Sequence, residues 1–211
     1  MTTVDIETAL DRFIAETREL FDQEPDLEKR WEAMPAVLGR LLADPGVLEA
    51  SKHWPECIMK DRAENLLFYV DPEYGFAINC TKTRPNYGER RPHSVHPDWR
   101  GIHDHAHIYT CYGMLTGQQT LERYERVGEA TPDHVEIKLS GNSDVGAGVI
   151  DLVKPYEIHA ERSLGEECIA VIIRSEKSGE FLQGRYTVGT GEYWEGQGPR
   201  QTPVEMFGHL K

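Results

Sequence analysis

Apolar positions near the N-terminus recur with helical spacing. Between Val4 and Phe21 they return about every 3.6 residues, which is the spacing of one helix face. A second run with this spacing opens at Asp26, and the Pro45-Gly46 pair after it is a natural stop. Pro35 lies inside the second run, and because proline removes a helical hydrogen bond, we expect a kink or a split there. The pattern predicts a helical N-terminal cap within residues 1–60.

From about Leu66 the pattern changes to short segments that are rich in β-branched and aromatic residues. Gly, Pro, Asn or Asp separate most of these segments, as expected of strands joined by turns. Such a series predicts an all-β barrel or sandwich over residues 61–190. The expected strands are 66–70, 74–80, 107–115, 119–127, 134–139, 148–153, 168–174 and 181–188.

Two stretches lack this strand-like pattern. Residues 83–101 are dense in Arg, Pro and Gly, which predicts a long loop, and residues 191–211 predict an irregular C-terminal extension that covers the barrel. No internal repeat and no clear linker interrupts the chain. We therefore expect residues 1–211 to form a single domain.

Composition narrows the classes of function. The formal net charge of −13 argues against a general nucleic-acid binder, which needs a basic face. No apolar run approaches the ~20 residues of a membrane helix. The acidic, amphipathic N-terminus resembles neither a secretory signal nor a transit peptide, and the four cysteines are widely spaced. These features predict reduced thiols, a cytoplasmic location and neither membrane nor nucleic-acid partners, whereas the oligomeric state is left open.

Three histidines stand at alternate positions, His103, His105 and His107. Alternate side chains of a strand share one face, and two imidazoles at this spacing can bind one metal ion at about 2.0–2.2 Å. A histidine cluster without a metal is the alternative interpretation. His159 ends a strand-like segment that opens at Gly148, and a barrel can bring such distant segments together at its mouth.

These residues resemble the two sequence motifs of the cupin superfamily. In the first motif His103, His105 and Gly117 match, whereas Thr110 stands where a glutamate is usual. In the second motif Gly148 and His159 keep the overall spacing, while the proline is displaced by one residue and Tyr156 replaces a glycine. The resemblance implies a mainly β cupin barrel with N-terminal α-helices. It also implies a divalent metal ion on His103, His105 and His159.

Within the cupins, the chain is most similar to the thiol dioxygenases, the cysteine dioxygenase and 3-mercaptopropionate dioxygenase group. The length, the helices before the barrel and a first motif without its glutamate carry this similarity. It implies iron(II), dioxygen and a small thiol or other anionic substrate that binds the metal. Arg174 and Glu176 stand where that group has a histidine and a tyrosine, and Cys111 lies beside Thr110, so a thiol substrate is not settled.

Two alternatives stay open. One is a three-histidine cupin of other chemistry, such as a carbon–carbon or ring-cleaving dioxygenase or a metal-dependent lyase or isomerase. The other is a non-catalytic cupin that only binds a small molecule. Imidazole ligands also accept metals other than iron, so the resemblance alone favours Fe(2+).

Further residues near the motifs are candidates for the site. Arg174 ends an apolar strand, and its planar guanidinium can bind both oxygens of a substrate carboxylate. Four other arginines are weaker candidates, because they are expected to face water. Tyr109 continues the expected inward face and either contacts substrate or only lines the barrel. Glu157 is a candidate ligand or imidazole acceptor, or else a solvated carboxylate at the rim. His107 is a candidate fourth ligand or a neighbour, and Asp104 is expected in a turn. The four other arginines are Arg84, Arg90, Arg91 and Arg100.

Overall fold

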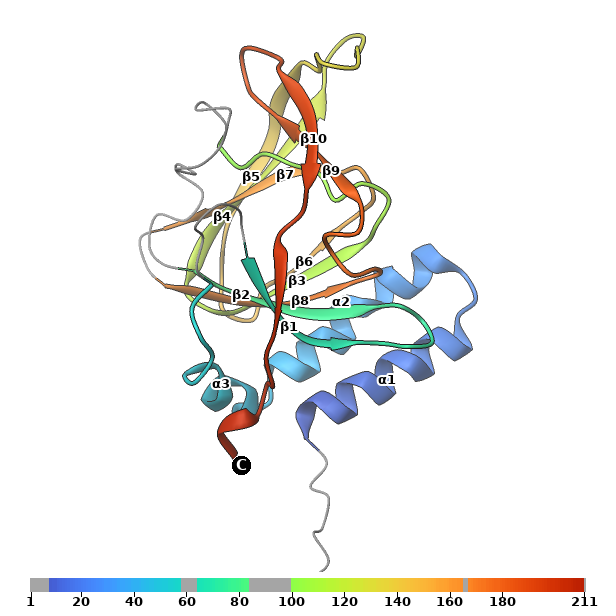
Figure 1. The fold of residues 1–211 in the computed structure, drawn as a ribbon, viewed down its shortest axis with the longest axis vertical. Coiled ribbons are helices and arrows are strands. Elements are labelled where there is room, and N and C mark those ends of the chain that lie inside the picture. Colours follow the sequence, from blue (N-terminus) through green and yellow to red (C-terminus); the bar gives the residue numbers. More distant parts are fainter. Residues whose placement is uncertain (1–7, 58–63, 84–99, 165–166, 211) are drawn as a thin grey trace, which may run out of the picture.

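A computed structural model describes residues 8–57, 64–83, 100–164 and 167–210. Three helices precede a barrel of β-strands, as Figure 1 shows. The mainly β barrel with N-terminal α-helices that the sequence predicts is confirmed. Most of the predicted loop over 83–101, with Arg84, Arg90 and Arg91, lies outside the described residues.

The first helix begins at a capping box. Helix α1 (Ala9–Gln23) follows Thr8, whose hydroxyl accepts the amide proton of Asp11 while the Asp11 carboxylate accepts the amide proton of Thr8. These two bonds satisfy backbone groups that a helix start otherwise leaves without partners. The last of these described helices ends with Ser51, within the predicted cap.

Two further helices follow directly. Helix α2 (Leu27–Leu42) begins after its cap residue Asp26 and is one element through Pro35, so the predicted split does not occur. The Pro45-Gly46 pair does more than stop a helix, because Pro45 opens helix α3 (Pro45–Ser51). Proline suits the first turn of a helix, where its missing amide proton costs nothing.

The larger sheet has six strands in the order β11-β1-β2-β8-β3-β6. Strand β11 pairs with β1 in parallel, and the other pairs in this sheet are antiparallel. The C-terminal extension is therefore partly regular, contrary to the expectation of irregular cover. The strands are β1 (Glu64–Val70), β2 (Ala77–Thr83), β3 (Thr110–Thr116), β6 (Ile150–Val153), β8 (Cys168–Arg174) and β11 (Arg200–Pro203).

The second side of the barrel is built from two smaller groups of strands. One is β5-β4-β7 and the other is β10-β9. Residues 102–104 run between them, since His103 forms isolated bridges to His159 on β7 and to Arg185 on β9. These strands are β4 (Gln118–Arg126), β5 (Ile137–Gly146), β7 (Ile158–Ser163), β9 (Leu182–Tyr186) and β10 (Tyr193–Gln197), and a short 3-10 helix (Gly208–Leu210) follows β11.

The strand-like segment from Gly148 to His159 is divided between two strands, β6 and β7. Strand β6 belongs to the larger sheet, whereas β7 belongs to the opposite side. The turn between them contains Tyr156 at a φ of 59°, in the left-handed region that non-glycine residues seldom adopt. The chain thus crosses from one layer to the other just before His159.

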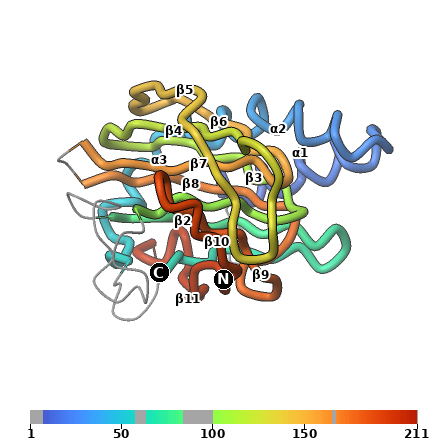
Figure 2. The backbone as a smooth tube through the Cα atoms, turned by 90° about the horizontal axis from the view of Figure 1, so that it is seen from above, coloured from blue at the N-terminus to red at the C-terminus, as the bar shows by residue number. Residues whose placement is uncertain are grey.

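Apolar packing divides into a helix-side core and a barrel interior. Cys111 and Leu115 of β3 pack with the helices, while Tyr112 and Met114 of the same strand belong to a cluster with Ile172. This alternation follows from the two faces of a strand. Odd-numbered residues of β3 therefore face the helices, and even-numbered residues face the interior. Seen from above, α1 and α2 project beyond the strands on one side of the molecule (Figure 2).

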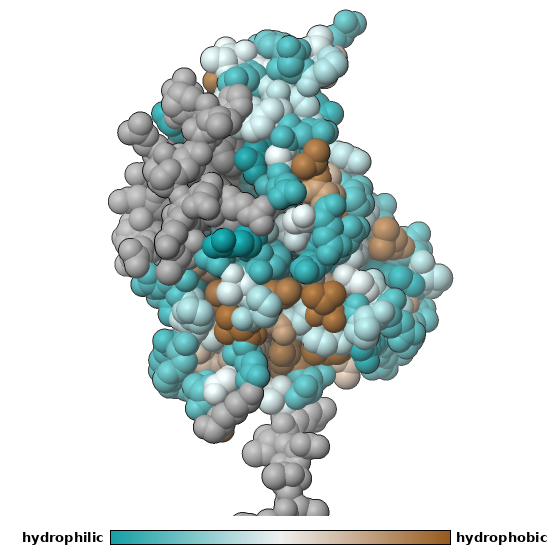
Figure 3. Space-filling model, in the orientation of Figure 1, coloured by the Kyte–Doolittle hydropathy of each residue, from teal (hydrophilic) through white to brown (hydrophobic). Residues whose placement is uncertain are grey.

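The surface is largely hydrophilic on the face drawn in Figure 3, with apolar side chains gathered below its centre, over the region of β1. All four cysteines are free thiols, as expected, and three of them are buried. Among the described helices, none is long and apolar enough to span a membrane. Single-domain organisation and a cytoplasmic location stay predictions.

Candidate metal centre

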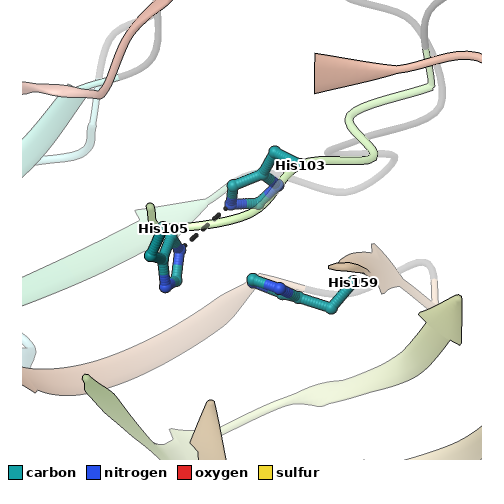
Figure 4. Close-up of side chains that lie close together, drawn as sticks. All are labelled: His103, His105 and His159. Atoms are coloured by element: carbon teal, nitrogen blue, oxygen red, sulfur yellow. Dashed lines mark hydrogen bonds between the residues drawn. The ribbon is translucent and has the colours of Figure 1, made fainter. Parts of the chain in front are cut away.

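Three histidine side chains converge on one point inside the barrel (Figure 4). One ligand nitrogen from each of His103, His105 and His159 can be chosen so that all three lie within 4.8 Å of one another. The Nε2 atoms of His103 and His105 are 3.1 Å apart. The structure therefore brings together the three residues that the sequence proposes as metal ligands.

Backbone pairing places two of these histidines side by side. The amide of His103 donates to the carbonyl of His159 at 3.0 Å, and the amide of His159 donates back at 2.9 Å. Residues paired in this way hold their side chains close together on one face. The ring centroids of His103 and His159 are accordingly 4.5 Å apart.

Asp104 fixes the backbone that carries His105. Its carboxylate accepts the amide protons of Ala106 at 2.8 Å and Gly184 at 3.0 Å, and it accepts the Tyr186 hydroxyl at 2.5 Å. Ala106 has a φ of 52°, so the chain turns sharply after His105 instead of continuing as a strand. The expected turn role of Asp104 is confirmed.

The turn at Ala106 directs His107 away from the other two rings. The side chain of His107 is 52% exposed, and its Nε2 lies 3.1 Å from a carboxylate oxygen of Glu176. The prediction that the three rings share one face is wrong for His107, because the period of two holds only within a strand and β3 begins at Thr110. His107 is therefore not a ligand in this arrangement.

Hydrogen bonds orient two of the rings toward the centre. The Nδ1 atoms of His103 and His159 lie 2.8 and 2.9 Å from the backbone carbonyls of Gly101 and Glu157. Carbonyls only accept, so each Nδ1 carries a proton, which leaves Nε2 as the atom available to a metal in the neutral ring. This is the usual arrangement of a histidine that binds a metal.

Burial and charge act differently on the two buried rings. Burial, with the neighbouring histidines and Arg174, lowers the pKa of His105 well below 6.5 and favours its neutral, ligating form. Burial also opposes protonation of His159, but the nearby Glu161 carboxylate outweighs it and raises the pKa of His159. Within the described part of the chain, the buried His105 Nδ1 and His159 Nε2 atoms have no hydrogen-bond partner. The three imidazoles and the unpartnered Nε2 of His159 fit a divalent metal ion.

A cavity of about 70 Å³ opens beside the histidines. Arg174 lines it from the end of β8; it is 4% exposed, and its Nη1 donates to the Asn79 amide oxygen at 3.1 Å. The predicted burial of Arg174 is confirmed. Lining side chains also include Asn65, Thr81, Tyr112, Glu161, Ile172, Gln183 and Arg185.

Two predicted site residues lie elsewhere. Tyr109 stacks on Trp31 of α2 with ring centroids 5.9 Å apart, so the expectation that it lines the barrel interior is wrong. The Glu157 carboxylate contacts Arg123 and accepts the Lys154 amide proton at 2.9 Å, and it is not among the residues that line the cavity. Its backbone carbonyl, not its side chain, orients His159. Arg100, expected to face water, is exposed.

Glu161 is a charged residue of the site that the sequence motifs do not predict. Its Oε1 lies 3.5 Å from the Nε2 of His159, and its side chain is 16% exposed. The signal was available, because a residue two positions after His159 on a strand shares the face of that histidine. Glu161 was not predicted because His159 was expected to be the last residue of its strand-like segment.

Fold and site together define a mainly β barrel with N-terminal α-helices and a three-histidine cluster beside a cavity. No model of a known protein family matches the sequence, and no curated protein matches it. Solved structures do match, at low identity. The Cnp3 cupin domain of Schizosaccharomyces pombe matches at 7% identity and a TM-score of 0.36, over 56% of this chain and 67% of that one.

Two other matches are of the same kind. Protein NMB1881 of Neisseria meningitidis matches at 14% identity and a TM-score of 0.34, over 55% of this chain and 87% of that one. A recombinant oxalate oxidase in complex with glycolate matches at 15% identity and a TM-score of 0.33, over 48% of this chain and 42% of that one. Likeness at this level says nothing about activity.

Proposed function

We propose that the protein is an iron(II)-dependent cupin dioxygenase that adds dioxygen to a small thiol or another anionic substrate able to bind the metal. The observation that carries the proposal is the convergence of three histidines beside a cavity that also contains the guanidinium of Arg174. Iron as the metal rests on the resemblance to thiol dioxygenases, since imidazoles accept several divalent metals.

The donor set supports oxygen chemistry on a bound anion. Three neutral imidazoles add no negative charge to a metal ion and leave coordination positions open, so the ion can attract an anionic ligand. Iron(II) held there would supply positions at which a substrate anion and dioxygen meet. The protein's own residues then have to bind, orient and shield the substrate.

Arg174 is the residue best placed to bind the substrate's anionic group. Its planar fork can hold both oxygens of a carboxylate, and the hydrogen bond to Asn79 holds the guanidinium in the cavity. A substrate with a metal-binding thiol at one end and a carboxylate at the other would then be fixed at two points. Holding a reactant in this way lowers the entropic part of the activation barrier.

Apolar and aromatic side chains complete the enclosure. Ile172 and Tyr112 line the cavity, and the Tyr112 hydroxyl donates to the Gln119 amide oxygen at 3.0 Å. Because Tyr112 and Ile172 are 8% and 1% exposed, this wall keeps bulk water from the metal side of the cavity. A small substrate is favoured by the cavity's size.

Oxygen uptake tests the proposal. Protein reconstituted anaerobically with iron(II) is mixed with aerated buffer and a panel of small thiols, diketones and hydroxy-aromatics. We expect uptake with a carboxylate-bearing thiol, with one dioxygen consumed per thiol and both oxygen atoms recovered on sulfur as the sulfinate. Uptake only with diketones or hydroxy-aromatics would support the carbon–carbon-cleaving alternative, and no uptake with any substrate would contradict the oxygenase class.

Replacing Arg174 tests its role separately. We expect Arg174→Gln to raise KM for a carboxylate-bearing thiol about 10- to 100-fold, as loss of a charge-assisted hydrogen bond would. KM for a thiol without a carboxylate should change little. Arg162→Gln is the matched control, because Arg162 pairs with Glu122 and does not line the cavity. Equal losses for both thiols would assign Arg174 to the fold instead.

A further inference from the structure

The first cupin motif lacks its acidic residue, yet the cavity contains a carboxylate. Thr110 occupies the position of the usual glutamate, is fully buried on β3, and its hydroxyl has no hydrogen-bond partner in the described ranges. Glu161 lines the cavity from β7, on the opposite side of the barrel. The carboxylate of the site thus comes from a different strand.

Glu161 shares a strand face with one of the three histidines. His159 and Glu161 are two positions apart on β7, and their neighbours across the pair on β4 are Arg123 and Leu121. Side chains at positions i and i+2 of a strand project in the same direction. The strand that presents His159 to the barrel interior therefore presents Glu161 on the same face.

The separation between the two side chains matches that of two ligands on one ion. Donor atoms that bind one transition metal at about 2.0–2.2 Å lie about 2.8–3.6 Å apart when they occupy neighbouring positions. The Nε2 atoms of His103 and His105 are 3.1 Å apart, and Glu161 Oε1 is 3.5 Å from His159 Nε2. Both distances fall within this range.

A comparison with the other nearby glutamate shows that the placement is specific. Glu157 lies two positions before His159, but the strand begins only at Ile158, and its carboxylate contacts Arg123 outside the cavity. Both side chains carry the same charge, and only Glu161 lines the cavity. Nearness to His159 in the sequence alone therefore does not explain why Glu161 lies at the cavity.

We propose that Glu161 is a fourth protein ligand of the metal, supplied from β7 in place of the carboxylate that the first motif lacks. This inference rests on the proposed metal site and deepens it. The carboxylate cancels one of the two positive charges of a divalent ion. In a six-coordinate ion it leaves two positions for exogenous ligands, which are enough for dioxygen and one donor atom of a substrate.

Metal affinity is the first test, with cobalt(II) as a stable spectroscopic probe added to the metal-free protein. We expect Glu161→Gln to weaken cobalt binding more than tenfold and to change the visible absorption of bound cobalt. Glu157→Gln is the matched control: it removes the same charge two residues on the other side of His159, and it should change affinity less than about threefold. Thermal unfolding of the metal-free variants checks that each is folded.

A second variant reports coordination directly. In Glu161→Cys, a thiolate at this position should bind cobalt and produce an intense charge-transfer band in the near ultraviolet, which an imidazole-only site lacks. The native cysteines do not line the cavity, so the band would come from position 161. This readout does not depend on the stability of the glutamine variant.

The outcomes separate this proposal from the proposed function. Wild-type protein that binds cobalt, with unchanged affinity and spectrum in Glu161→Gln and no charge-transfer band in Glu161→Cys, overturns the role of Glu161 and leaves the three-histidine site intact. Wild-type protein that binds no metal overturns both. Loss of affinity in Glu161→Gln, together with the band in Glu161→Cys, supports direct ligation.

Discussion

Asp104 links three parts of the site through a single carboxylate. It accepts protons from the turn after His105, from the backbone of Gly184 on β9 and from the hydroxyl of Tyr186. Asp104, Gly184 and Tyr186 are buried, and there a lost acceptor leaves donors without partners. The position of His105 thus depends on a residue that does not itself contact a metal.

Asp104→Ala should separate positioning from ligation. We expect the free energy of unfolding to fall by about 1–3 kcal/mol and cobalt affinity to fall about tenfold, because the turn that aims His105 loosens. Denaturant unfolding and metal titration measure the two effects. Asp133→Ala, in an exposed turn, is the control that should change neither. Reduced stability with unchanged affinity would assign Asp104 to the fold alone.

His105 makes the stability of the metal-free protein depend on pH. Its pKa in the folded protein lies well below 6.5, mainly because of burial, so the unfolded chain binds a proton that the folded protein excludes. Its contribution is fully present above pH 6.5 and is lost as the pH falls below that value. The raised pKa of His159 acts in the opposite direction, so the two contributions partly offset.

A variant isolates the contribution of His105. In the metal-free protein, we expect Tm to fall between about pH 7.5 and about pH 5.5, and to fall less in His105→Asn, which has no group to protonate. Thermal unfolding followed by circular dichroism at several pH values gives both slopes. A His105→Asn slope equal to or steeper than that of the wild type would contradict the assigned pKa direction.

Among the elements, helix α2 covers the face of the larger sheet that points away from the site. Trp31 is fully buried, stacks on Tyr109 and meets the edge of Phe21 at a centroid distance of 6.0 Å. These contacts lie on the helix side of the sheet, and the cavity lies on its other side. The helices are therefore expected to stabilise the barrel without taking part in ligand binding.

Trp31→Ala tests this division. We expect a loss of about 3–5 kcal/mol in the free energy of unfolding, as for other buried aromatic side chains. Cobalt affinity of the folded variant should stay unchanged. Leu27→Ala, on the same helix but 53% exposed, should cost no more than about 0.5 kcal/mol. A folded Trp31→Ala protein that no longer binds metal would show that α2 also supports the site.

At the scale of the whole molecule, much of the architecture could be predicted from pattern alone. Short segments rich in β-branched and aromatic residues and bounded by turn residues identified most of the strands, and the HxH spacing with a distant third histidine selected side chains that the fold brings together. Both signals are local or nearly so. Residues whose positions follow from these local patterns, such as the buried Arg174, were therefore placed correctly.

Other features depended on single backbone conformations that local sequence does not announce. The left-handed turn at Ala106 shifts the alternation by one residue, so His107 and Tyr109 leave the interior that Tyr112 enters. Few alanines adopt such a φ, and Asp104 stabilises it through a contact 80 residues away in sequence. Glu161 was missed because the chain crosses between layers at Tyr156, which starts a new strand before His159.

The central claim, a metal ion held by His103, His105 and His159, is tested most directly by metal stoichiometry. Protein reconstituted anaerobically with iron(II) and freed of excess metal is analysed for iron, beside His159→Ala prepared in the same way. One iron per chain in the wild type and only a trace in the folded variant is the predicted result. Equal iron in both proteins, or no iron in the wild type, would contradict the claim.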